Sequence, residues 1–233
     1  MKKLGLIGGI GPESSIEYYR QLIKAYQETA GTTDYPEMVM HSIDLTALLA
    51  YINANQPEEL VGFLAERINV LDAAGCDFGA MASNTPHMVF DSLQKKVDLP
   101  LVSIVEVTCQ AIAQSGLTKV ALLGTRFTMS QGFYQKAAEK YGIEVVSPVP
   151  DQQEFIHRIY MGELLFNRIV PETKKQLLRI VSDIKEKEAI QGLILGGTEL
   201  PLILHQSDFS GLQVFDTTQI HVASLVKRMT ESK

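Results

Sequence analysis

The sequence predicts an α/β protein with two pseudo-symmetric domains built on parallel sheets, and three observations lead to this prediction. Short apolar runs that end in glycine or polar residues alternate with longer amphipathic stretches, as in βα units. One part of the chain recurs later in the same order. The length of 233 residues fits two compact halves, and 45% hydrophobic with 21% charged residues is typical of globular proteins.

The elements follow in order along the chain. Apolar runs bounded by glycine, proline or polar residues predict strands at residues 4–8, 37–42, 77–82, 101–104, 120–124, 144–147, 193–196 and 213–215. Helical periodicity predicts helices at residues 14–28, 57–74, 130–141, 171–187 and 219–229. The second helix starts with Pro57, followed by Glu58 and Glu59, which favour a helix N-terminus. The last helix is predicted to be capped by Asp216 or Thr217.

An internal repeat supports the division into two halves. Residues 3–9, followed by a helix carrying Tyr18, align without gaps on residues 119–125, followed by a helix carrying Tyr134, at an offset of 116. Residues 78–85 align on residues 192–199 at an offset of 114. Any two βα units share some likeness, but here both order and spacing match.

The repeat predicts domain boundaries and the place of a ligand. We expect residues 1–103 plus 217–233 to form an N-terminal α/β half and residues 104–216 a C-terminal α/β half. The loops at the carboxyl ends of the strands are expected to line a ligand cleft between the two halves.

Composition limits the partners and the compartment. Lys and Arg number 21 against 27 Asp and Glu, a net charge of −6, so no nucleic acid and no membrane surface is an expected partner. The apolar runs are shorter than the roughly 18 to 20 residues of a membrane span. Cys76 and Cys109 have neither zinc-site nor disulfide spacing. We expect a cytoplasmic protein with no metal and no cofactor that binds a small molecule.

The loop after the first strand is a candidate anion site. Gly9, Ile10 and Gly11 stand where a strand turns into a helix, where glycine allows close backbone approach and a helix N-terminus favours a carboxylate or phosphate. The alternative is a tight turn with an N-cap from Ser14 or Ser15. A dinucleotide fingerprint is not predicted, because the third glycine is replaced by Ser14.

The loop after the third strand carries several polar side chains. Ser83, Asn84 and Thr85 provide hydroxyl and amide groups that can bind a carboxylate. His87 is a candidate acid or base near neutral pH, although a lone histidine in a first helical turn is more often a packed or capping residue.

Two loops of the second half occupy the repeated positions. Thr125 and Thr128 have the spacing of a helix cap and can also contact an anion. Thr198 and Glu199 align with Asn84 and Thr85 of the first half. Glu199 is either a catalytic group or an acid that complements a helix dipole.

Together these loops resemble the aspartate/glutamate racemase family of cofactor-independent amino-acid racemases. The resemblance covers nearly the whole chain and rests on Gly8-Gly9-Ile10-Gly11-Pro12-Glu13, Ser83-Asn84-Thr85-Pro86-His87, Gly124-Thr125, Gly197-Thr198-Glu199-Leu200 and Asp216-Thr217-Thr218-x-x-His221. It implies two α/β domains, a homodimer, and a substrate bound at its carboxylate. It also implies one catalytic cysteine per domain, one thiolate removing the α-proton and the other thiol returning one.

The sequence departs from the family at both cysteine positions, which are Ser83 and Gly197. A serine without a neighbouring base is a poor proton acceptor, and glycine has no side chain. We assign the catalytic positions to Ser83 and Gly197, with His87 and Glu199 as alternative bases. The resemblance implies a substrate site formed by Gly9, Ile10, Gly11, Asn84, Thr85, Thr125, Thr128 and Thr198.

Three explanations for the missing thiols stay open. Ser83 is an engineered replacement, or the chain catalyses an isomerisation or related carbon-acid reaction with other groups, or it binds a small carboxylate without turnover. We predict an amino-acid racemase-type isomerase acting at the α-carbon of a small amino acid or carboxylate. A non-catalytic or regulatory binding protein is the alternative.

Overall fold

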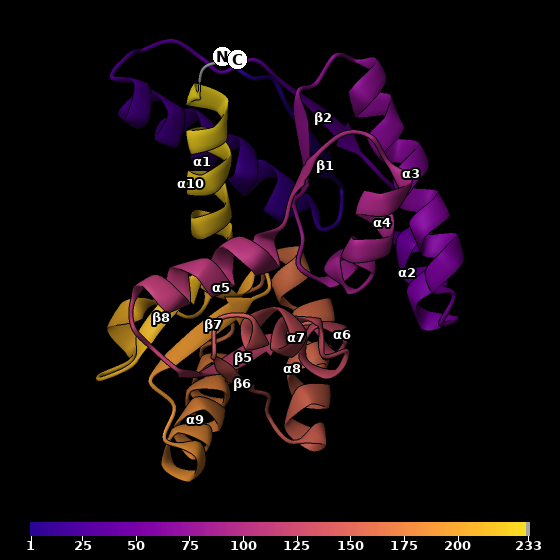
Figure 1. Ribbon diagram of the computed structural model, residues 1–233. Helices are drawn as coiled ribbons and strands as arrows, with labels where there is room; N and C mark the ends of the chain where they lie inside the picture. The colour runs from indigo at the N-terminus through magenta and orange to yellow at the C-terminus, as the bar shows by residue number, and fades with distance from the viewer. Residues whose placement is uncertain (232–233) are drawn as a thin grey trace. The chain divides into compact units, whose positions relative to one another are not determined.

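The computed structural model describes residues 1–231, and within them the strands form two four-stranded parallel sheets (Figure 1). The predicted α/β class is confirmed. The chain divides into two compact units: unit 1 is Met1–Ile104 with the chain from His221 onward, and unit 2 is Val105–Ile220. This division puts residues 217–220 in unit 2, whereas the sequence-based boundary put them in the N-terminal half. Residues 232 and 233 lie outside the described residues.

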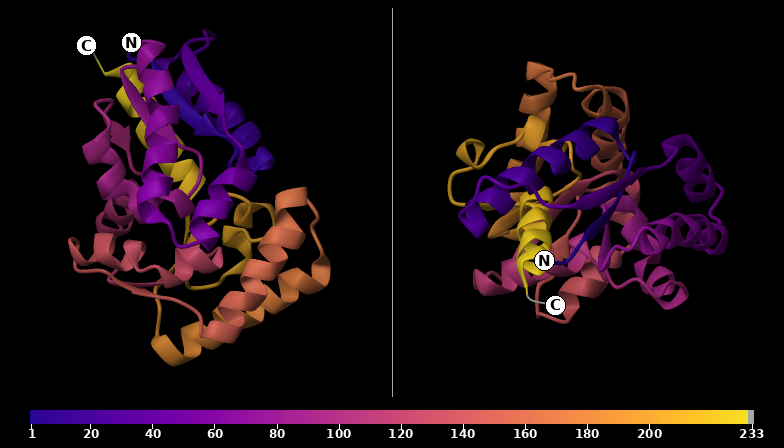
Figure 2. Two further views of the ribbon diagram at one scale, coloured as in Figure 1. Left: turned by 90° about the vertical axis from the view of Figure 1, so that its right-hand side faces the viewer. Right: turned by 90° about the horizontal axis from the view of Figure 1, so that it is seen from above.

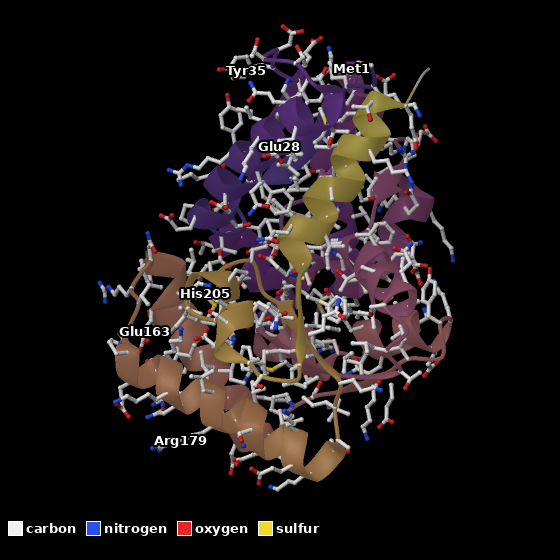
Figure 3. The ribbon with its side chains drawn as sticks, turned by 90° about the vertical axis from the view of Figure 1, so that its left-hand side faces the viewer. Met1, Glu28, Tyr35, Glu163, Arg179 and His205 are labelled. Carbon is white, nitrogen blue, oxygen red and sulfur yellow. The ribbon has the colours of Figure 1, made fainter. Side chains whose placement is uncertain are left out.

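Unit 1 has the strand order β2-β1-β3-β4. Its strands are β1 (Leu4–Gly8), β2 (Met38–Ser42), β3 (Phe78–Met81) and β4 (Leu101–Val102). Its helices are α1 (Pro12–Ala30), α2 (Leu45–Asn53), α3 (Pro57–Ala73), the 3-10 helix η1 (Thr85–Val89), α4 (Phe90–Lys96) and most of α10 (Thr217–Thr230). Helices α1 and α10 lie on one side of the sheet, and α2, α3 and α4 lie on the other (Figures 1 and 2). Glu28 near the end of α1 and the exposed Tyr35 after it point outward (Figure 3).

Unit 2 has the equivalent order β6-β5-β7-β8. Its strands are β5 (Lys119–Gly124), β6 (Glu144–Val146), β7 (Gly192–Gly196) and β8 (Gln213–Asp216). Its helices are α5 (Ile104–Gln114), α6 (Arg126–Ser130), α7 (Phe133–Glu139), α8 (Pro150–Gly162), η2 (Leu164–Phe166), α9 (Pro171–Glu188), η3 (Leu200–Leu202) and η4 (Gln206–Asp208). Helices α8 and α9 lie side by side (Figure 2), and their buried residues pack in one core with those of β5 and β7. Arg179 of α9 points away from this core (Figure 3).

The strand register supports the internal repeat. In unit 1, Leu4 of β1 is paired with Phe78 of β3. In unit 2, Val120 of β5 is paired with Gly192 of β7. These four residues are the ones that the two sequence offsets equate, so the repeated segments occupy equivalent places in the two sheets.

The two repeated tyrosines are fully buried anchors of the helices that follow the first strand of each unit. The Tyr18 hydroxyl donates to His221 Nδ1 at 2.8 Å, because the other ring nitrogen, Nε2, donates to the Val102 carbonyl at 3.1 Å. In unit 2, Tyr134 is buried beside Thr108 of α5. Each tyrosine therefore ties its helix to the unit by a contact distant in sequence.

Two parts of the helix prediction differ from the structure. The pattern predicts a helix over residues 130–141, but α7 begins only at Phe133, because Gly132 before it has a left-handed φ of 74°. The structure also adds α2, α4, α5, α6 and α8 to the predicted helices. The nearly continuous apolar sequence of α2 hides its helical period.

The start of α10 provides a test of its predicted cap. Asp216 Oδ1 accepts hydrogen bonds from the backbone N–H groups of Thr218, at 2.9 Å, and Gln219, at 3.1 Å, which confirms Asp216 as a cap. We expect Asp216→Ala to lower the free energy of unfolding by about 1 kcal/mol, measured by urea denaturation. The exposed neighbour offers a control, Gln219→Ala, with an expected change within about 0.5 kcal/mol. Equal losses in both variants would contradict the capping role.

Candidate active site

The first loop of unit 1 is a tight turn fixed by its own helix. Gly9 and Gly11 have φ values of 79° and 96°, a region that favours glycine. The Gly9 N–H donates to Ser15 Oγ at 2.8 Å, and a Cβ on Gly9 would lie 2.6 Å from the Ile43 nitrogen. The buried Ile10 lies between the two glycines. Glycine at position 9 is therefore required by the turn itself.

The two serines after this loop do not cap the helix as the alternative interpretation predicts. Helix α1 begins at Pro12, so Ser14 and Ser15 lie inside its first turn. Ser14 Oγ instead donates to the Ala82 carbonyl at 2.7 Å. This bond links the first loop to the end of β3.

The second loop lies beside the first, because β1 and β3 are neighbouring parallel strands. Ser83, Asn84 and Thr85 follow β3 after one residue, Ala82, and are 8%, 2% and 7% exposed. The structure thus brings together the sequence-predicted residues of unit 1 at the carboxyl end of its sheet. Polar side chains in such a buried turn can bind a substrate carboxylate.

His87 is a packed residue of this turn. Its Nε2 accepts a hydrogen bond from the Ile104 N–H at 3.3 Å, so the proton of the neutral ring is on Nδ1. The ring stacks on Phe90, with centroids 5.1 Å apart. Burial lowers the pKa of His87 to about 4, against an opposing effect of the Ser83 and Asn84 backbone carbonyls. The imidazole is therefore neutral near pH 7, and its Nε2 is occupied by the backbone.

In unit 2, the loop after β5 forms the cap of α6. Thr125 Oγ1 accepts from the Thr128 N–H at 3.3 Å and lies 3.1 Å from Thr128 Oγ1. Thr128 is fully buried, and its Cβ would be 2.9 Å from a Cβ on Gly124. The predicted capping role of Thr125 is confirmed, and Thr128 packs against the end of β5.

The loop after β7 holds a buried carboxylate with two hydroxyl donors. Glu199 is 1% exposed, and its Oε2 accepts a hydrogen bond from Thr198 Oγ1 at 2.8 Å. The same oxygen accepts a hydrogen bond from the Tyr160 hydroxyl. Burial, and then the charge of Glu199, raises the pKa of Tyr160 well above 10. Tyr160 is therefore a phenol, not a phenolate, near neutral pH.

Tyr160 is a residue of the candidate site that the sequence analysis did not predict. It belongs to α8, and its side chain fills the place of the one that Gly197 lacks. A Cβ built on Gly197 would lie 2.9 Å from Tyr160 Oη and 3.0 Å from Cζ. The sequence shows that residue 197 has no side chain. It does not show which other residue fills the space beside Gly197.

Neither cysteine of the chain is suited to act as a thiolate. Cys76 and Cys109 are buried, the first just before β3 and the second in α5. Burial raises the pKa of the Cys76 thiol, and burial followed by the charge of Glu106 raises the pKa of Cys109 to about 12. Both thiols therefore stay protonated near neutral pH.

Comparison with known proteins identifies the family. The family model described as Asp/Glu/Hydantoin racemase matches residues 7–225. The chain belongs to the Asp/Glu/Hydantoin racemase family. A crystal structure of an aspartate racemase homologue from Pyrococcus horikoshii OT3 is 38% identical, with a TM-score of 0.85, and the match covers 99% of this chain and 100% of that one.

Two curated sequence relatives of this racemase-family chain have names that state a racemase activity. The broad specificity amino-acid racemase RacX of Bacillus subtilis (strain 168) is 28% identical, over 61% of this chain and 63% of RacX. The match therefore spans less than two thirds of RacX. The glutamate racemase of Aquifex aeolicus (strain VF5) is 26% identical, over 88% of this chain and 76% of that protein.

Among residues 1–231, we find no group of three or more His, Cys, Asp or Glu side chains placed to hold a metal ion. Over the same residues, none of the helices combines the length and the apolar character that crossing a membrane requires.

Proposed function

We propose that this chain is an amino-acid racemase-type isomerase that acts, without a cofactor, at the α-carbon of a small amino acid or carboxylate. One observation carries the proposal: the polar turn after the third strand recurs in register after the equivalent strand of the second unit. Ser83-Asn84-Thr85 follows β3, and Gly197-Thr198-Glu199 follows β7. Racemisation needs an acid/base group on each face of the α-carbon, and a duplicated turn suits that need.

The polar groups of the turns suit an amino-acid substrate. We assign Asn84, Thr85 and Thr125 to the substrate carboxylate, since amide and hydroxyl groups can donate to it. The Thr198 hydroxyl already donates to Glu199, which leaves its lone pairs for the substrate ammonium. Holding the carboxylate with several donors stabilises the negative charge that develops when the α-proton leaves.

The roles of the other candidates follow from their contacts. His87 supports the turn through its bond to the Ile104 N–H, so it is a positioning residue. Gly197 has no side chain that could carry a proton, and the space beside it is filled by the ring of Tyr160. Ser83 stands where the family resemblance expects the first acid/base group, with a hydroxyl in place of a thiol.

The family resemblance also leads us to propose a homodimer that works in the cytoplasm. Light scattering of the purified chain tests the first of these, and fractionation of the source cells tests the second.

Proton NMR in deuterated water tests the proposed reaction. Incubated with a panel of L- and D-amino acids, the chain is expected to remove the α-proton signal of at least one, because the abstracted proton exchanges with solvent. Loss of the circular dichroism of that amino acid would show racemisation. Heat-denatured protein at the same concentration is the control.

The absence of thiols at Ser83 and Gly197 favours a second candidate, a binding protein for a small carboxylate. It predicts calorimetric binding of a panel member with no loss of any α-proton signal. That result would reject the isomerase.

A further inference from the structure

We infer that the Tyr160 hydroxyl, held by Glu199, is the acid/base group of unit 2 and replaces the side chain that Gly197 lacks. This inference rests on the proposed function. Tyr160 lies on α8, outside the repeated turns and outside the family motifs that the sequence displays.

The first support for this inference is the position of the Tyr160 ring. The family resemblance expects an acid/base side chain at residue 197, and the Tyr160 ring occupies the volume that a side chain there would enter. Its hydroxyl oxygen would be 2.9 Å from a Cβ on Gly197. A phenol hydroxyl therefore stands beside the position that the Cβ of the expected acid/base residue would take.

The second support is the chemistry of the Tyr160 side chain. Of the aromatic residues that could fill this volume, phenylalanine would fill it without a proton to give, whereas a tyrosine can donate and accept one. A side chain that only fills space does not require a hydrogen bond to a carboxylate. Tyr160 nevertheless donates to the buried Glu199, which Thr198 also binds. The three side chains form a connected group at the carboxyl end of β7.

The hydrogen bond to Glu199 supplies a route for the proton. The Tyr160 O–H bond breaks and its proton joins the Glu199 carboxylate. The phenolate oxygen then takes the α-proton: the Cα–H bond breaks, its electron pair stays on the substrate, and the Tyr160 O–H bond forms again. The reverse sequence returns a proton to the α-carbon.

This route keeps the total charge of Tyr160, Glu199 and the substrate constant. The negative charge moves from Glu199 to the substrate, so Tyr160 and Glu199 never carry two negative charges together. Two adjacent charges at so buried a position would be strongly unfavourable. Tyr160 is thus the catalytic residue of the inference, and Glu199 is its positioning residue and proton acceptor.

Tyr160→Phe tests the hydroxyl and keeps the ring against Gly197. With the amino acid that the unmodified chain exchanges fastest, we expect α-deuterium incorporation to fall at least 100-fold. The matched control is Tyr134→Phe, a change of another buried tyrosine of unit 2 that lies in α7, and its rate should stay within twofold. Near-ultraviolet circular dichroism checks that both variants are folded.

Two further variants keep the inference testable if Tyr160→Phe does not fold. Tyr160→3-fluorotyrosine keeps the hydroxyl and makes the phenol more acidic, so the Tyr160-dependent limb of the pH–rate profile should move to lower pH. Glu199→Gln removes the charge that raises the Tyr160 pKa and cannot accept the proton. We expect a slower reaction with that limb again at lower pH. If Tyr160 had a purely structural role, the pH–rate profile would not shift in either variant.

The outcomes separate the two proposals. If the unmodified chain exchanges no amino acid, the proposed function fails and the role of Tyr160 fails with it. If the unmodified chain is active and Tyr160→Phe keeps more than a tenth of its rate, or the limb does not move, only the role of Tyr160 is overturned. Tyr160 would then be a filler of the space beside Gly197.

Discussion

Acidification from pH 6.5 to 4.5 is expected to lower the stability of unit 1 by about 4 kcal/mol through His87 and His221 alone. Burial lowers the pKa of His87 to about 4, and burial followed by the charge of His87 lowers the pKa of His221 to about 3. In the unfolded chain both rings protonate near their usual pKa of 6.5. Between these values the unfolded state binds more protons, so the free energy of unfolding decreases as the pH falls and is unaffected by these rings above pH 7.

Urea denaturation at a series of pH values measures this effect. Each ring contributes a slope of up to about 1.4 kcal/mol per pH unit near pH 5. His87→Gln and His221→Gln are each expected to remove one such slope, even where they lower the stability itself. The exposed His205 (Figure 3) provides the control, His205→Gln, which should leave the slope as it is. Slopes that stay the same in all three variants would show that the buried rings are not the cause.

Gly197→Cys, the change that would restore a thiol, is expected to destabilise unit 2 by about 3 kcal/mol. The new Cβ would lie 2.9 Å from Tyr160 Oη and 3.0 Å from Cζ, closer than packed atoms approach. The ring cannot easily move away, because it is 5% exposed and its hydroxyl is bound to Glu199. The matched change in unit 1 is Ser83→Cys, which alters size little and should cost less than about 1 kcal/mol.

A double-mutant cycle identifies the cause of that loss. Tyr160→Ala removes the ring and costs about 3 kcal/mol by itself. In that background Gly197→Cys should cost less than about 1 kcal/mol, which gives a coupling energy of about 2 kcal/mol between the two positions. Additive losses would mean that Tyr160 does not block the position. Restoring a thiol to unit 2 therefore requires both changes, Gly197→Cys and Tyr160→Ala.

The parts of the fold that depend on local sequence were predictable. The strands and their polar turns follow from short apolar runs and from glycine, and the cap at Asp216 follows from its place before a helix. The repeat predicted which strands are equivalent, and the register of β1 with β3 and of β5 with β7 agrees with it.

The parts that depend on distant contacts were not predictable. The place of Tyr160 is set by the packing of α8 against the end of β7, and no spacing within the chain encodes that contact. The same holds for His87, whose Nε2 is occupied by the backbone of Ile104. Sequence shows which side chains are chemically capable, but tertiary packing decides which of them are already engaged.

The place of helix α10 in unit 1 affects how the protein is made. Unit 2 is one continuous stretch of chain, whereas the core of unit 1 includes the last helix, α10. The partner of the Tyr18 hydroxyl, His221, is translated only after the whole of unit 2, and the Lys2 N–H likewise binds the Met229 carbonyl at 2.9 Å. Domains usually complete their folding in the order in which they are translated. Here unit 1, which is translated first, must wait for a helix that is translated after unit 2, so unit 2 can finish folding before it.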